Sequence, residues 1–103
     1  MSEFQIKKKI QEYEEEYVED LKRLVRIRSV RDSAAVCPGT PFGKGIREAF
    51  DCFLEIGERF GFPAADFDGY ACHLSYGEQE EYVGVLGHLD VVAPGDGWTV
   101  TQP

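Results

Sequence analysis

The stretch VGVLGHLDVVAPGDGW, Val83–Trp98, changes from apolar to polar at its centre. Its first four residues and the preceding tyrosine form YVGVL, Tyr82–Leu86. This continuous apolar run is typical of a strand buried on both faces. We therefore predict a strand over about 82–87. His88 comes directly after this strand. Because ligands of open α/β sheets bind beyond the carboxyl ends of the strands, His88 is a candidate site residue.

Asp90 is the second candidate, since residues i and i+2 of an extended chain point to the same side. A neutral imidazole binds zinc through one ring nitrogen, and a carboxylate can orient the ring by accepting the proton of the other nitrogen. Asp90 could therefore fix the tautomer of His88 without touching a metal, or it could bind the metal itself. The residues alone leave both roles open.

Upstream of this stretch, residues 3–28 are expected to form one long amphipathic helix. Ser2 and Gln5 have the spacing of a capping box at its start. Apolar residues then recur every three or four positions and share one face of the helix: Ile6, Ile10, Tyr13, Tyr17, Leu21 and Leu24.

A second amphipathic helix is predicted over 41–60, with Gly45 as an alternative start. Thr40 and Pro41 suit its start, and Gly61 suits the position directly after its end. The residues around Lys44 spell GKG but lack the remainder of a phosphate-binding loop. We interpret Lys44 as an exposed structural residue.

The hydrophobic period changes from helical to alternating at residues 70–76, which predicts a strand. Cys72 and Leu74 should share one of its faces and His73 the other. A strand histidine outside any motif is more often packed or exposed than ligating, so His73 is not expected to bind metal. Two helices followed by strands of a mixed sheet indicate an α/β fold.

Composition excludes several classes of protein. The 103-residue chain carries a formal net charge of -8, which argues against nucleic acid or an anionic membrane as a partner. No apolar stretch is long enough to span a bilayer, and the N-terminus lacks the apolar core of a signal peptide. The three cysteines, Cys37, Cys52 and Cys72, have neither metal-site nor disulfide-framework spacing. Free thiols and a cytoplasmic location are expected.

GHLDVVAPGDGW resembles the first metal-binding motif of the zinc aminoacylase and dipeptidase family of metallopeptidases. The upstream PFGKGIREAFDCFLEIGERFGF and DGYACHLSYGE are similar to the PepV-like branch of Xaa-His (carnosinase-type) dipeptidases. The resemblance covers essentially the whole chain. One departure is visible, because Ala93 stands where the family usually has the proline that here follows as Pro94.

The resemblance implies that His88 is a zinc ligand and that Asp90 is the catalytic aspartate beside it. It also implies two zinc ions in the intact enzyme, held by further carboxylate and histidine ligands that would lie beyond Pro103. On this reading residues 1–103 are an incomplete N-terminal portion of the catalytic domain, and the lid domain is absent. The isolated chain is then expected to be inactive and to bind zinc weakly at most.

The expected function of the full-length protein is zinc-dependent hydrolysis of dipeptides, with small peptides as substrates. Two alternatives remain open at this point. One is a sibling amidohydrolase that removes acyl or succinyl groups from N-acylated amino acids. The other is a non-catalytic binding module that keeps the fold, in which an unpaired strand edge and exposed apolar surface favour self-association.

Overall fold

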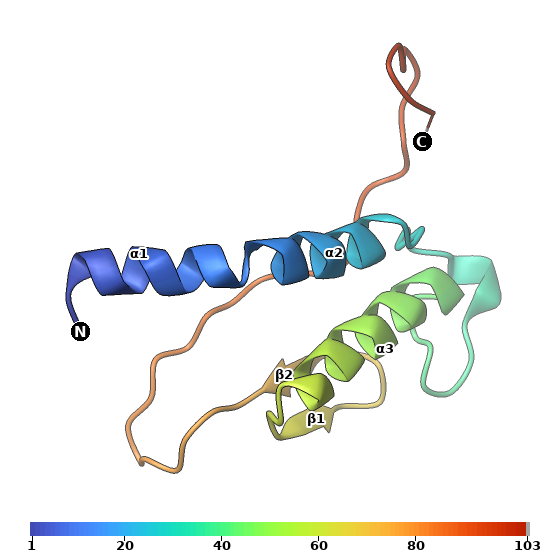
Figure 1. Cartoon of the computed structure of the whole chain (residues 1–103). Helices are drawn as coiled ribbons and strands as arrows, with labels where there is room; N and C mark the ends of the chain where they lie inside the picture. Colours follow the sequence, from blue (N-terminus) through green and yellow to red (C-terminus); the bar gives the residue numbers. More distant parts are fainter. Residues whose placement is uncertain (103) are drawn as a thin grey trace.

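The computed structural model describes residues 1–102, which form three helices, a short 3-10 turn and a small hairpin (Figure 1). The elements are α1 (Glu3–Glu12), α2 (Glu14–Val25), the 3-10 turn η1 (Ser33–Ala35), α3 (Lys44–Arg59), β1 (Ala64–Asp66) and β2 (Cys72–Leu74). The α/β class expected from the sequence is confirmed. The sheet within the described residues has two antiparallel strands, whereas a mixed sheet was predicted.

The predicted helix over 3–28 is two helices in line, and it ends earlier than expected. The capping box is confirmed, because the Ser2 hydroxyl accepts from the Gln5 amide and the Gln5 side chain accepts from the Ser2 amide. At Tyr13 the amide turns back to the carbonyl of Ile10, which tightens one turn and separates α1 from α2. Three glutamates in the first turn of α2 stabilise this second start through the helix dipole.

Helix α3 begins at Lys44, three residues after the predicted start at Pro41 and one residue before the alternative start at Gly45. Gly43 precedes it with φ 99°, a backbone conformation that cannot continue a helix, and its amide bonds the Thr40 carbonyl in a turn. The predicted C-terminus is confirmed to within one residue. The amides of Gly61 and Phe62 bond the carbonyls of Glu58 and Gly57, which is a Schellman motif.

The apolar core lies on α3, whose buried hydrophobic side chains are those of Ile46, Ala49, Phe50 and Cys52. An ion pair between Arg59 and the buried Asp20 joins α3 to α2, and the Arg23 guanidinium lies 2.8 Å from the Glu55 carboxylate. The apolar face predicted for the first helix is not covered. Five side chains of this face are 45–57% exposed: Ile6, Ile10, Tyr13, Tyr17 and Leu21.

The hairpin packs on the far part of α3, where Leu74 of β2 lies against Gly57 (Figure 1). The strand predicted over 70–76 is confirmed at its centre as β2, with Cys72 and Leu74 half-buried and His73 exposed. Its partner β1 was not predicted. The turn between them contains Asp68 and Gly69, both with positive φ.

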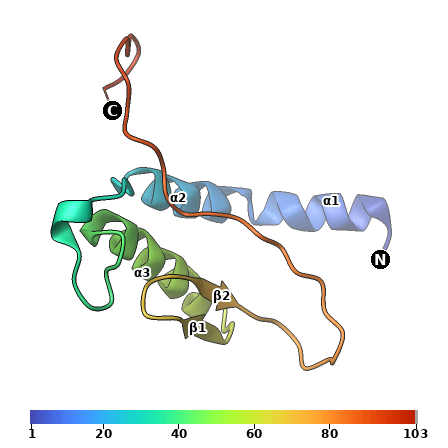
Figure 2. The same ribbon diagram turned by 180° about the vertical axis from the view of Figure 1, so that it is seen from behind.

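The buried strand predicted over 82–87 does not form. Val83, Val85 and Leu86 are 92–99% exposed, and the segment makes no strand ladder with any part of residues 1–102. Figures 1 and 2 show this segment leaving β2, looping away from the helices and returning past α2. An isolated strand cannot satisfy its backbone or bury its side chains, so the prediction fails where neighbouring strands are missing.

None of the helices described in residues 1–102 is long and apolar enough to cross a membrane.

Candidate functional site

The segment that carries both candidate site residues is held to the helices at its C-terminal side. The Val91 amide donates to the Ser29 carbonyl at 3.0 Å, and Val91 and Val30 form an isolated parallel bridge. Ser29 is 2% exposed and follows the end of α2. This contact holds Val91, which directly follows Asp90, against the segment that connects α2 to α3.

His88 and Asp90 form a pair, as their i, i+2 spacing predicts. His88 Nδ1 lies 3.1 Å from Asp90 Oδ1 and 2.9 Å from the Asp90 backbone carbonyl oxygen. Since a carbonyl oxygen can only accept, Nδ1 donates and carries the proton of the neutral ring. The lone pair then lies on Nε2, which is the nitrogen left for a metal.

This pair is open to solvent. The His88 side chain is 82% exposed and that of Asp90 56% exposed. Residues 77–90 make no hydrogen bond to the helices or to the hairpin. Within the described part of the chain, the imidazole is therefore oriented by Asp90 alone.

The donor set fits one part of a zinc site. One imidazole nitrogen of the right tautomer is present, with a carboxylate that orients it. A catalytic zinc has at least three protein ligands, and residues 1–102 contain no group of three or more histidine, cysteine, aspartate or glutamate side chains that could hold a metal. His73 lies elsewhere, on β2, with its ring 5.5 Å from that of Phe67.

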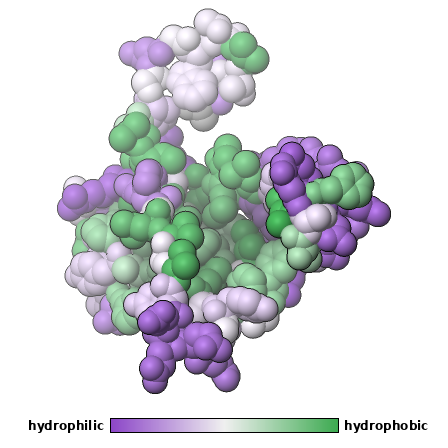
Figure 3. Space-filling view, turned by 90° about the vertical axis from the view of Figure 1, so that its left-hand side faces the viewer, coloured by the Kyte–Doolittle hydropathy of each residue, from purple (hydrophilic) through white to green (hydrophobic). Residues whose placement is uncertain are grey.

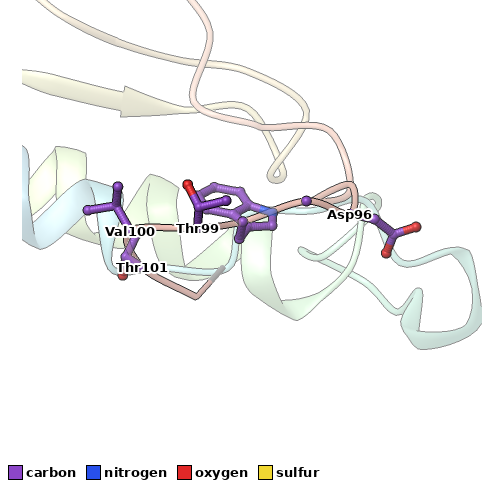
Figure 4. Close-up of a pocket in the computed structure, with 6 residues that line it drawn as sticks. Asp96, Thr99, Val100 and Thr101 are labelled. Carbon is purple, nitrogen blue, oxygen red and sulfur yellow. The ribbon is translucent and has the colours of Figure 1, made fainter.

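The loop after the pair folds back on itself. Trp98 Nε1 donates to the Gly95 carbonyl at 2.8 Å, in the region where the sequence has its Pro-Gly and Asp-Gly turn signals. A shallow pocket of about 390 Å³ is lined by Asp96–Thr101 (Figure 4). The Asp96 carboxylate points away from Thr99 and Val100 in this view, so the pocket does not gather acidic groups.

A second cleft, of about 430 Å³, lies between α2 and α3. Its lining is mostly charged, and Cys52 is the buried thiol in it. Burial raises the pKa of this thiol, which keeps it protonated and unreactive at neutral pH. All three cysteines are free, as expected.

Sequence reasoning missed the residues that hold the site segment in place. Ser29 and Val30 carry no motif, and only the apolar character of Val30 and Val91 hints at their pairing. Gly45 is the other missed residue, because it allows α3 to approach the backbone of Arg28 closely. Such contacts depend on the arrangement of distant segments.

Comparisons with known proteins identify relatives along most of the chain. The protein named "Putative dipeptidase YtjP" of Bacillus subtilis is 45% identical over 85 residues, which are 82% of this chain and 18% of the relative. "Putative dipeptidase SH1171" of Staphylococcus haemolyticus is 46% identical over 92 residues, or 89% of this chain and 20% of the relative. The corresponding protein of Staphylococcus aureus strain USA300 is 44% identical over the same length.

The chain therefore spans about a fifth of the length of these curated relatives. No family model matches it.

Proposed function

We propose that residues 1–103 are the N-terminal portion of a zinc-dependent dipeptidase of the PepV-like branch. The observation that supports this most strongly is the His88–Asp90 pair, in which Nδ1 is bonded and Nε2 is left free. It lies in a chain that is 44–46% identical to proteins named as dipeptidases. We call the longer protein that contains this segment the parent protein.

In the parent protein His88 would hold one of two zinc ions through Nε2. Bound zinc supplies an activated water for attack on the peptide carbonyl. Asp90 keeps the proton on Nδ1 and fixes the ring plane, so that Nε2 faces away from the pair. Asp90 is therefore proposed to act through His88.

The isolated chain should not hydrolyse dipeptides. It offers one oriented zinc ligand, and the remaining ligands, the general base and the lid would be supplied by the rest of the parent protein. The test compares steady-state hydrolysis of a panel of dipeptides by the pure chain and by the parent protein. Turnover by the parent alone supports the proposal, and steady turnover by the isolated chain would overturn it.

A sibling deacylase or desuccinylase is less favoured, because the relatives are named as dipeptidases. The same experiment separates the two by including N-acetyl and N-succinyl amino acids beside the dipeptides. Small peptides are the proposed substrates. The free cysteines suit a reducing compartment, so we place the parent protein in the cytoplasm.

Self-association is proposed for the isolated chain. Residues 82–86 combine an unpaired extended backbone with apolar side chains that are almost fully exposed. Figure 3 shows apolar side chains gathered on the face seen from the N-terminal side of the molecule. Surfaces of this kind associate to remove apolar area from water and to pair the free strand edge.

A further inference from the structure

Gly45 lies where the first turn of α3 meets the chain that leaves α2. A Cβ atom added at this position would lie 2.0 Å from the Arg28 carbonyl oxygen and 3.7 Å from the Ser29 Cα. These are backbone atoms and cannot rotate away, as the end of a side chain could. Any larger residue at position 45 must therefore displace the backbone of Arg28 and Ser29.

The displaced backbone is the one that holds the candidate site. The Ser29 carbonyl accepts from the Val91 amide at 3.0 Å, and Val30 forms the parallel bridge with Val91. No other hydrogen bond joins residues 77–91 to the helices or the hairpin in the described chain. Val91 directly follows Asp90, whose carbonyl and carboxylate both bond His88 Nδ1.

We infer that Gly45 is a positioning residue for the His88–Asp90 pair. The absence of a side chain at position 45 lets α3 pack against Arg28 and Ser29. Ser29 then holds Val91, and Val91 fixes the backbone from which Asp90 orients the imidazole. This inference rests on the proposed function for its catalytic meaning, but the physical link from α3 to His88 is measurable in the isolated chain without any enzyme assay.

The test compares Gly45→Ala with Gly57→Ala in the 103-residue chain. Both glycines lie in α3, and both substitutions gain about 1 kcal/mol of helix propensity. The Cβ added at Gly57 meets the Leu74 side chain, at 2.3 Å from Cδ2, on the hairpin side of α3. It does not face the backbone that holds Val91, so Gly57→Ala is the matched control.

Two measurements report on the proposed link between Gly45 and the His88–Asp90 pair. Amide hydrogen exchange at Val91 reports its bond to Ser29, and the ¹⁵N shifts of the His88 ring in weakly alkaline solution report which nitrogen carries the proton. Far-UV circular dichroism checks that α3 remains folded. In Gly45→Ala, Val91 should exchange about fivefold faster, as expected for the loss of one hydrogen bond, and the share of the Nδ1–H tautomer should fall.

Gly57→Ala should leave both readouts as in the wild type. If Gly45→Ala preserves the Val91 protection and the His88 tautomer, the inference is wrong. If Gly45→Ala loses its helical signal, the same two measurements are made on Val30→Gly. This substitution weakens the bridge to Val91 without changing any residue of α3. An unchanged tautomer in Val30→Gly would also overturn the link. Absence of dipeptidase activity in the parent protein would contradict the proposed function and leave these readouts unaffected.

Discussion

The ring of His88 is oriented by a single residue, Asp90. Its Nδ1 lies 2.9 Å from the Asp90 carbonyl oxygen and 3.1 Å from Asp90 Oδ1, so both acceptors favour the same tautomer. The free Nε2 that results is what a zinc ligand needs. Because both acceptors belong to Asp90, the geometry of the pair follows the backbone of Asp90, which the bond between the Val91 amide and the Ser29 carbonyl holds.

Removal of the Asp90 carboxylate should lower the zinc affinity and the activity of the parent protein without abolishing them. In Asp90→Ala the backbone carbonyl still accepts from Nδ1, so the tautomer is favoured less strongly. We expect zinc affinity or activity to fall about 10–100-fold, the usual effect of removing a group that orients a metal ligand. Asp96→Ala, which removes an exposed carboxylate from the following turn, is the control and should change neither quantity.

Acid should destabilise the chain partly through Asp66. The hydrogen bond from Arg47, and then that from the Gly69 amide, lower the pKa of Asp66 below its ordinary value of 3.8. A carboxyl whose pKa is lower in the folded state stabilises the fold above its unfolded pKa, and this contribution is lost as the pH falls through the folded pKa. We therefore expect the urea midpoint to drop below about pH 4.

In Asp66→Asn the midpoint should already be lower at pH 6, and its decline in acid should be shallower. Asp68→Asn lies in the same turn, and asparagine tolerates the positive φ of that position, so it is the control. Equal acid profiles for wild type and Asp66→Asn would show that the contact with Arg47 contributes nothing to stability.

The three thiols should differ in reactivity, with one reacting faster than the other two. Cys37 is exposed, whereas burial raises the pKa of both Cys52 and Cys72. Since the thiolate is the reactive form, a disulfide reagent at pH 8 should label one thiol quickly and two slowly. Cys37→Ser should remove the fast phase, and in strong denaturant all three thiols should react together. A fast phase that survives Cys37→Ser would contradict the slow reaction expected of the buried Cys52 and the half-buried Cys72.

Self-association of the isolated chain should depend on residues 82–86. Val85→Lys places a charge in the exposed apolar run and should shift the chain toward monomer in sedimentation velocity. Val100→Lys is the matched control, since Val85 and Val100 are equally exposed at 97% but Val100 lies outside the run. A wild-type chain that stays monomeric at high concentration, or equal effects of the two substitutions, would exclude this surface as the contact.

Local features of the fold could be predicted from the sequence, because their causes are local. Ser2 and Gln5 cap α1 with side chains three residues apart, and Gly61 ends α3 through bonds to its last turn. The pairing of His88 with Asp90 follows equally from i, i+2 geometry. The Asp68–Gly69 turn was also readable as a hairpin signal, and with it β1 could have been predicted.

Features that depend on distant partners could not be predicted. The apolar run 82–86 has the composition of a buried strand, but a strand is buried only where other strands and helices cover it. The bridge between Val30 and Val91, and the close approach of Gly45 to Arg28, join segments that carry no motif. Any further ligands of the proposed zinc site would likewise depend on distant segments.

The most direct test of the proposed metal site replaces each histidine of this segment in the parent protein. His88 and His73 are its only histidines and both are exposed, so His73→Ala is the matched control. Zinc content and dipeptide hydrolysis should be measured together. We predict that His88→Ala loses zinc and nearly all activity, while His73→Ala keeps both. A His88→Ala protein with wild-type zinc content and rate would contradict the assignment.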